Sequence, residues 1–258
     1  MCISPITFKI IFIRMIILKR RCLLIGAPDT ILRGVQKDID SMYRFLRSTA
    51  GGAWEDNEIT KIENPPKSDL QQLLQKNVYY DFVFIFFSGH GGTSVVDESG
   101  YVNINADEKI RVAEFVNKAD KEIVIIDSCR SYTTEVTEKM AKYEKLAEDH
   151  LRNYYRQLYD GEINKAEKGF LILYASSLGE TANETNEGGI FTQSLIGGAL
   201  SSITNRAGIY RIYKIFSIKE AFLLAYKIVT GNYKSQHPSI EGSVRRNYWF
   251  PFALKLVR

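Results

Sequence analysis

A histidine and a cysteine each come just after a short apolar run in this chain. His90 lies in a Ser-Gly-His-Gly-Gly sequence that follows Phe82–Phe87, and Cys129 comes after Ile123–Ile126 and an Asp-Ser pair. A thiolate is a strong nucleophile, and a neighbouring imidazole can take the proton from the thiol. The two residue types therefore predict nucleophilic catalysis, provided that the fold brings them together.

Both apolar runs have the length and composition of buried β-strands. They are rich in β-branched and aromatic residues and show no polar alternation, which is typical of strands covered on both faces in a parallel sheet. In an open α/β sheet, chemistry gathers beyond the carboxyl ends of the strands. If the two strands are neighbours, His90 and Cys129 face each other across that edge.

Other strands and helices alternate along the chain. Further strands are predicted at Cys22–Gly26, Ile59–Ile62, Phe170–Tyr174 and Tyr248–Leu256, with Pro251 indicating an edge position for the last, and a hairpin arm at Tyr101–Ile104. Helices are predicted at Val35–Leu46, Ile110–Val116 and Thr192–Leu200. Two more begin at capping boxes, Ser68 with Gln71 and Ser217 with Glu220. This order predicts an α/β fold with a mostly parallel central sheet flanked by helices.

The length of 258 residues favours one large domain, and 45% apolar and 25% charged residues are ordinary for a folded protein. We expect residues 1–21 to be an N-terminal extension, either an extra strand or a tail, and residues 22–258 to form the domain. Residues 131–168 read as an insertion directly after the cysteine. Apolar residues spaced by three or four predict one long amphipathic helix there.

The overall composition argues against several partners. The net charge of +4 is too small to indicate nucleic-acid binding. The three cysteines lie far apart, which disfavours disulfides and thiolate metal sites and favours a reducing, cytoplasmic location. The apolar segment Ile3–Leu18 is interrupted by Lys9 and Arg14 and is shorter than the ~20 residues of a membrane helix, so membrane attachment is not expected.

The motifs, in this order, resemble the caspase and metacaspase family of cysteine peptidases. The resemblance rests on Leu23–Gly26, Leu32–Gly34 with Asp38, Phe87–Gly91, Ile126–Ser131, Tyr174–Ser177, Glu180, Ala182, Glu184 and Gly189–Thr192. It covers about residues 22 to 200, and the order of histidine before cysteine also matches. It implies a three-layer caspase-like fold, with the insertion placed where caspases carry a processed linker, and hydrolysis of protein or peptide substrates.

The resemblance also implies roles for individual residues. Cys129 would be the nucleophile, and His90 the acid–base that protonates the leaving amine. The backbone N–H groups of Gly91 and Cys129 would form the oxyanion hole, where each donor is typically worth about 3 kcal/mol of barrier. The alternative for either residue alone is a buried small side chain or a turn residue, and it is their joint occurrence in these contexts that favours catalysis.

Substrate preference follows from charge near the cysteine. The resemblance to metacaspases places Asp127 and Asp38 in the substrate pocket, with Ser88 beside them, and two acids there favour a cationic side chain. We therefore expect cleavage after Arg or Lys, although Arg33 lies one residue from the position of the caspase pocket arginine. The alternative is that the two acids cap helix or loop N–H groups.

The sequence departs from the family in two places. Val35 replaces a cysteine that metacaspases usually have. Around Asp97, Glu98, Asp107 and Glu108 there is no convincing counterpart of their calcium-binding acids, so we expect no metal or other cofactor. A monomer and a homodimer both stay open, because caspases pair through an edge strand and metacaspases mostly do not.

Two further alternatives concern activity. Lysines and arginines in the insertion (Lys139, Lys142, Lys145, Arg152 and Arg156) suit self-cleavage by a basic-specific enzyme, or they belong to a solvated helix. A catalytically silent caspase-fold module that binds partners is the main rival to the peptidase hypothesis. A nucleotide-binding Rossmann domain is disfavoured because the first loop lacks the G-x-G-x-x-G pattern, and a tyrosine phosphatase because Glu135 stands where an arginine is needed.

Overall fold

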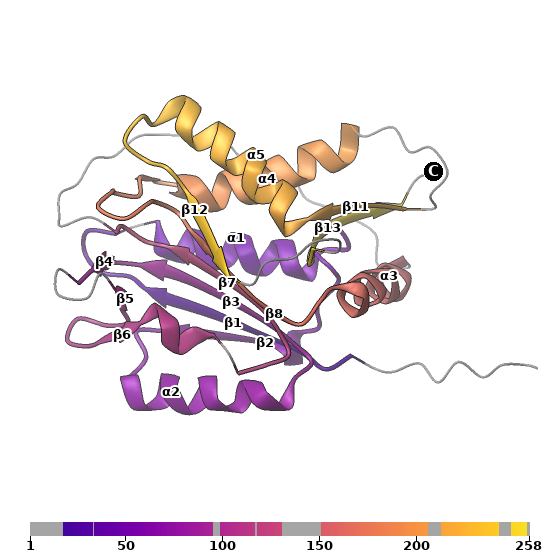
Figure 1. Ribbon diagram of the computed structural model, residues 1–258, viewed down its shortest axis with the longest axis horizontal. Coiled ribbons are helices and arrows are strands. Elements are labelled where there is room, and N and C mark those ends of the chain that lie inside the picture. The colour runs from indigo at the N-terminus through magenta and orange to yellow at the C-terminus, as the bar shows by residue number, and fades with distance from the viewer. Residues whose placement is uncertain are drawn as a thin grey trace, which may run out of the picture.

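The structure is a computed structural model that describes residues 18–32, 34–94, 99–116, 118–130, 151–205, 213–242 and 249–256. Within these ranges the centre of the molecule is a six-stranded sheet with the order β12-β8-β7-β3-β1-β2 (Figure 1). The parallel strands are β1 (Arg20–Ala27), β2 (Ile59–Glu63), β3 (Phe82–Gly89), β7 (Lys121–Asp127) and β8 (Gly169–Tyr174), and β12 (Ser239–Gly242) runs antiparallel to β8. The predicted α/β class with a mostly parallel sheet is therefore confirmed.

Helices cover both faces of the sheet and complete three layers. One face carries α1 (Val35–Arg47), α3 (Arg152–Lys165), α4 (Ile190–Asn205) and α5 (Ile218–Asn232). The other face carries α2 (Lys67–Gln75) and the 3₁₀ helix η3 (Val112–Phe115), while η1 (Asp56–Glu58) and η2 (Lys76–Tyr79) are short connecting turns. In Figure 1 the sheet lies between α2 and the pair α4 and α5.

The burial of β3 explains why its sequence shows no polar alternation. Phe82, Phe84 and Phe86 pack toward the α1 side, and the intervening residues pack toward the α2 side. Successive side chains of a strand point to opposite faces, so a strand with a hydrophobic core on each side is apolar throughout. The same alternation divides Ile123 and Ile125 of β7 from Val124 and Ile126.

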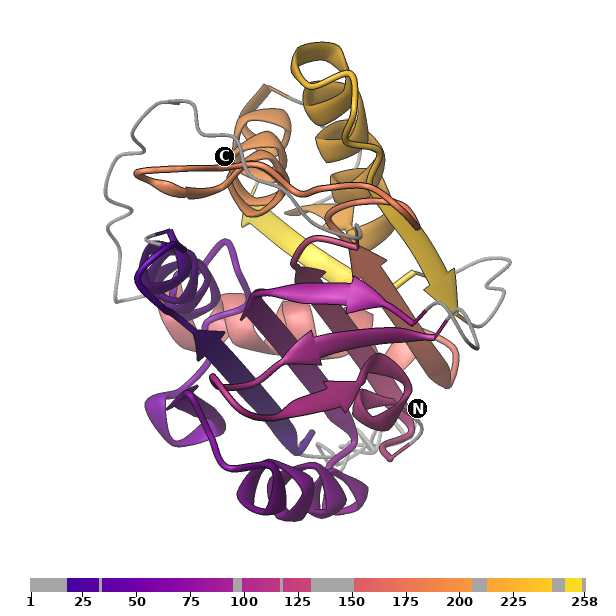
Figure 2. The same cartoon turned by 90° about the vertical axis from the view of Figure 1, so that its left-hand side faces the viewer.

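In the described residues, three small sheets lie outside the central one. Beyond the end of β3, the strands β4 (Gly91–Thr93), β5 (Gly100–Asn103) and β6 (Lys109–Arg111) form an antiparallel arm. Figure 2 shows this arm in front of the sheet, between α2 and the α4–α5 pair. The other two are the hairpin of β9 (Glu184–Thr185) with β10 (Gly188–Gly189), and the pair β11 (Tyr213–Ser217) with β13 (Pro251–Leu256).

The first strand begins at Arg20, earlier than the predicted Cys22, because a buried ion network holds this end. The Arg20 guanidinium lies 3.2 Å from Glu58 and 4.4 Å above the Trp54 ring, and Arg156 of α3 donates to the same glutamate at 2.7 Å. Burial alone opposes ionisation of Glu58, but Arg156 and Arg20 outweigh it and lower its pKa from 4.5 to about 2. The network fixes α3 against the amino-terminal end of the sheet.

Several local predictions are wrong. Ser68 caps no helix, because α2 starts at Lys67, the Ser68 hydroxyl donates to Asp69 and Gln71 bonds to Glu114. The predicted helix Ile110–Val116 is the strand β6 followed by a 3₁₀ turn. The edge of the central sheet beside β8 is β12, which was not predicted because its polar sequence gives no strand signal. The predicted last strand is present as β13, an edge strand that pairs with β11 outside the central sheet.

Other local predictions are confirmed. The capping box of Ser217 with Glu220 opens α5. The insertion is helical over Arg152–Lys165, while residues 131–150 and 1–17 lie outside the described ranges. No helix in the described part of the chain is long and apolar enough to cross a bilayer.

Candidate active site

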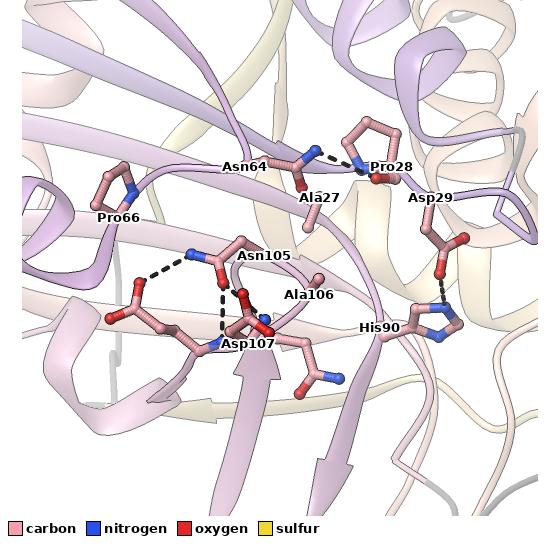
Figure 3. A pocket seen from close by; sticks show the side chains of 11 residues that line it. Ala27, Pro28, Asp29, Asn64, Pro66, His90, Asn105, Ala106 and Asp107 are labelled. Atoms are coloured by element: carbon pink, nitrogen blue, oxygen red, sulfur yellow. Dashed lines mark hydrogen bonds and ion pairs between the residues drawn. The ribbon is translucent and has the colours of Figure 1, made fainter.

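His90 follows the last residue of β3 and lies at the carboxyl edge of the sheet. Gly89 precedes it at φ 157°, and a Cβ there would lie 2.9 Å from the Ala27 side chain of β1, so only glycine allows this close passage. The His90 imidazole is 36% exposed, and its Nε2 lies 2.8 Å from Oδ2 of Asp29 (Figure 3). The strand end thus directs the ring to an acid on the neighbouring loop.

Asp29, which sequence analysis did not select, stands two residues after β1. Its Oδ1 accepts the N–H groups of Ile31 at 2.8 Å and Leu32 at 2.7 Å, and its Oδ2 faces His90. Partial burial opposes ionisation, but these two N–H groups and His90 outweigh it and lower the pKa of Asp29. An ionised carboxylate held by its own loop fixes both the tautomer and the direction of the imidazole.

Cys129 comes two residues after the end of β7 and is half-buried. Its Sγ lies 3.3 Å from the backbone nitrogen of Ala182 and 3.5 Å from the carbonyl oxygen of the same residue. Burial raises the pKa of the Cys129 thiol; the Ala182 N–H opposes this rise, and the charges of Asp127 and Glu184 add to it. The thiol is therefore protonated at neutral pH and needs a base before it can attack.

The two chain segments meet at Gly91. β3 and β7 are parallel neighbours with Ser88 opposite Asp127, and a Cβ on Gly91 would lie 2.9 Å from Cβ of Ser128 and 3.0 Å from the carbonyl oxygen of Cys129. The prediction that the two strands are neighbours is confirmed. In the described residues the imidazole bonds to Asp29 and the thiol to Ala182, and no hydrogen bond joins the two side chains. In unliganded sites a base and its nucleophile often come into hydrogen-bond contact only with substrate.

The backbone N–H group of Gly91 is turned away from the neighbouring strand. The Asn103 N–H donates to the His90 carbonyl at 3.0 Å, beside the pairing of Gly91 with Val102. This pattern makes Gly91 and Val102 a non-hydrogen-bonded pair, in which the N–H of Gly91 points away from β5. The N–H group expected in the oxyanion hole is therefore not used by the β4–β5 ladder.

The predicted pocket residues Asp38, Ser88 and Asp127 lie together beneath the sheet edge. Ser88 Oγ donates to Oδ2 of Asp38 at 2.8 Å. The two carboxyls belong to different elements, since Asp38 lies in the first turn of α1 and Asp127 ends β7. They are 2% and 6% exposed respectively, so both are held inside the protein.

Gly189 and Thr192, which belong to a motif of the family resemblance but were given no role from the sequence, donate hydrogen bonds to these acids. The Gly189 N–H donates to Oδ1 of Asp38 at 2.7 Å, and the Thr192 N–H and hydroxyl both donate to Oδ2 of Asp127. Burial raises the pKa of Asp127 to about 6 against the opposing Thr192 hydrogen bonds. Burial and the repulsion of Asp127 raise the pKa of Asp38 well above its usual value.

The β9–β10 hairpin lies directly on the two carboxyls. Gly188 has φ 116°, and a Cβ there would lie 2.2 Å from Oδ1 of Asp38, while a Cβ on Gly189 would lie 2.3 Å from Oδ2 of Asp127. Glu184, at the start of the hairpin, is half-buried, and its charge, like that of Asp127, raises the pKa of the Cys129 thiol. A cation that approaches the cysteine therefore meets three acidic groups.

Metal binding has no support in the described ranges. They contain no group of three or more His, Cys, Asp or Glu side chains arranged to hold an ion. Asp107 and Glu108 lie in the β5–β6 turn, whereas Asp97, Glu98 and the pocket candidate Arg33 lie outside the described residues. The absence of a cofactor thus stays a prediction.

Comparisons with known proteins bear on this arrangement. Caspase-1 from Spodoptera frugiperda is 13% identical with a TM-score of 0.55 over 87% of both chains. A protein of Geobacter sulfurreducens is 16% identical with a TM-score of 0.53 over 89% of this chain and 95% of that one. At such identities the likeness is one of fold. A search of curated proteins found no match. The family model described as the caspase domain, Peptidase C14, matches residues 19–248, and the chain therefore belongs to the caspase domain family.

Proposed function

We propose that this chain is a cysteine endopeptidase in which Cys129 attacks the peptide carbonyl and His90 transfers the protons. The observation that carries the proposal is the close approach of Gly91 to Ser128 and Cys129, which leaves no room for a Cβ and brings the loop of the histidine against that of the cysteine. A thiol and an imidazole at one edge of a sheet are the minimal groups for acyl transfer through a thioester.

These groups and one water molecule account for every proton transfer and every bond formed or broken in the reaction. His90 takes the proton of the thiol, the sulfur–carbon bond forms, and the N–H groups of Gly91 and Cys129 stabilise the oxyanion. The carbon–nitrogen bond then breaks as His90 gives its proton to the leaving amine. Water hydrolyses the thioester with His90 as base, which releases the carboxylic acid and restores the thiol. Asp29 is a positioning residue here, since it holds the imidazole at 2.8 Å.

The proposed substrate preference is for Arg or Lys before the cleaved bond. Asp38, Asp127 and Glu184 all act on the cysteine side of the site, and burial makes the first two costly to ionise without a counter-charge. A guanidinium or ammonium group supplies that counter-charge. Because Gly188 and Gly189 cover the carboxyls, we expect the β9–β10 hairpin to shift when a cation binds.

Covalent labelling tests the proposed activity. An arginyl chloromethyl ketone should modify Cys129, with the adduct located by mass spectrometry, and labelling should be lost in His90→Ala. An aspartyl analogue should react far more slowly. Equal labelling of wild type and His90→Ala would contradict the proposed role of the histidine. No labelling at all, with no hydrolysis of arginyl peptides, would favour the catalytically silent module.

Self-cleavage, if the enzyme processes its own insertion, is proposed for the part of the insertion that precedes α3. Arg156 donates to Glu58, and the Arg152 guanidinium donates to the carbonyl groups of Arg47 and Trp54, so both arginines are engaged in the fold. We therefore expect cleavage after Lys139, Lys142 or Lys145 and not within α3. Identical band patterns for incubated wild type and Cys129→Ala would show that no self-cleavage occurs.

A further inference from the structure

A cavity opens on the side of His90 that faces away from Cys129. It has a volume of about 620 Å³, within the range of about 300–1,000 Å³ that is usual for ligand pockets. Its walls come from the loops that follow β1 and β2 and from the β5–β6 turn, and they include Asp29, Asn64, His90, Asn103, Asn105 and Asp107. Figure 3 shows His90 and Asp29 at one end and Asp107 toward the other.

The strand order fixes where this cavity lies relative to the scissile bond. Cys129 follows β7 and His90 follows β3, and the next two strands in the sheet are β1 and β2, whose loops form the far wall. The acids Asp38 and Asp127 belong to the other side, beneath the β9–β10 hairpin. His90 thus separates the acidic pocket from the cavity.

That position suits the part of the substrate that departs with the amine. His90 gives its proton to the leaving nitrogen, so the residue that follows the cleaved bond must begin on the imidazole side. The residue that precedes the bond lies instead on the side of the oxyanion hole and of Asp127. The cavity is large enough for a long side chain together with part of the following backbone.

The walls present hydrogen-bond acceptors in a fixed frame. Asn105 accepts the N–H groups of Asp107 at 2.9 Å and Glu108 at 2.8 Å, and it donates to the Pro65 carbonyl and to Glu108 at 2.9 Å each. These bonds set the β5–β6 turn before any ligand arrives. Among the lining residues that the structure describes, none is a lysine or an arginine.

The carboxylates that line the cavity differ in how many hydrogen bonds they already accept. The Asp29 carboxylate is used by His90 and its own loop, and Glu108 by Asn105 and by the Lys67 N–H. Among the described residues, the side chain of Asp107 has no hydrogen bond or ion pair, and it is exposed. Asp107 is therefore the carboxylate that can still take a donor.

We propose that this cavity binds the side chain of the residue directly after the cleaved bond and selects a basic one through Asp107. The inference rests on the proposed peptidase function and adds a second determinant of specificity to it. A dibasic sequence then satisfies both sides, with one cation near Asp127 and the next near Asp107.

The test uses quenched fluorescent peptides that have arginine before the cleaved bond. They differ only in the residue directly after that bond, which is Lys, Gln or Glu. Wild-type kcat/KM for the Lys peptide should exceed that for Gln about fivefold, which corresponds to about 1 kcal/mol for a part-exposed ion pair, and the Glu peptide should be poorest. In Asp107→Asn the ratio of Lys to Gln should approach one. Mass spectrometry of the products confirms which bond is cut.

Two controls separate this inference from the proposed function. Asp120→Asn makes the same change at the opposite end of the sheet, where Asp120 pairs with exposed Lys168, and should keep the wild-type ratio. An arginyl coumarin amide reports on the catalytic groups without a following residue. Suppose that wild type cuts this amide. If it then shows no preference for the Lys peptide, or if Asp107→Asn shows the same preference as wild type, the inference is wrong and the peptidase function stands. If wild type cuts neither substrate, both fall.

Discussion

Replacing Asp127 with asparagine should make the protein more stable and less active. The change keeps the size of the side chain and an oxygen that accepts the Thr192 hydrogen bonds, and it removes only the charge. Burial raises the pKa of Asp127 from 3.8 to about 6, which corresponds to an upper limit of about 3 kcal/mol, at ~1.36 kcal/mol for each pH unit. At pH 8 the wild type carries this cost and the variant does not.

The pH dependence gives the sign of the effect. Below pH 3.8 the carboxyl is protonated in both the folded and the unfolded chain, so the two proteins should be equally stable there. Between pH 3.8 and about 6 the unfolded carboxyl ionises first, and the wild type loses stability relative to Asp127→Asn as the pH rises. Above that range the difference should be constant.

Urea unfolding at pH 4, 5, 6 and 8 measures this difference in unfolding free energy. In thermal unfolding at pH 8, a gain of up to ~3 kcal/mol would raise Tm by roughly 6–12 °C for a chain of this size. The same variant should lose at least about tenfold in kcat/KM on arginyl peptides, because the counter-charge for the cation is gone. Asp120→Asn, whose carboxylate is exposed, serves as the control. An Asp127→Asn protein that is less stable than wild type at pH 8 would refute the reasoning, since the charged acid would then be a structural acceptor.

Three other changes have definite expected outcomes. Asp29→Asn should lower kcat about tenfold with little change in KM, because the imidazole of His90 loses its charged partner, and an equal rise in KM would point instead to a binding role. Glu58→Gln should cost about 3 kcal/mol of unfolding free energy at pH 7, since the pKa of Glu58 is lowered from 4.5 to about 2; urea melts should show this deficit vanish as pH falls through that range. Gly188→Ala should lower Tm and arginyl-peptide turnover together, because its Cβ would meet Asp38 and its φ disfavours alanine; unchanged melting would show that the hairpin is pliable.

Local sequence was enough to locate the parallel strands of the central sheet and the loops that carry His90 and Cys129. Runs such as Phe82–Phe87 and Ile123–Ile126 are apolar on both faces, and that pattern arises only where both faces are covered. Parallel neighbours end at one edge, so the order of motifs already placed the loops of His90 and Cys129 at the same edge of the sheet. The weaker predictions were those that relied on a single local signal, as the failed capping box at Ser68 shows.

Only the tertiary structure decided what surrounds those two side chains. Asp29 reaches His90 across 61 positions of sequence, Ala182 reaches Cys129 across 53, and Gly189 reaches Asp38 across 151. No local pattern encodes such contacts, because they depend on how loops from different strands fold over one edge. Strand β12 also depends on the tertiary structure, because its polar residues form a strand only by pairing with β8. The cavity beyond His90 exists only where three separate loops converge.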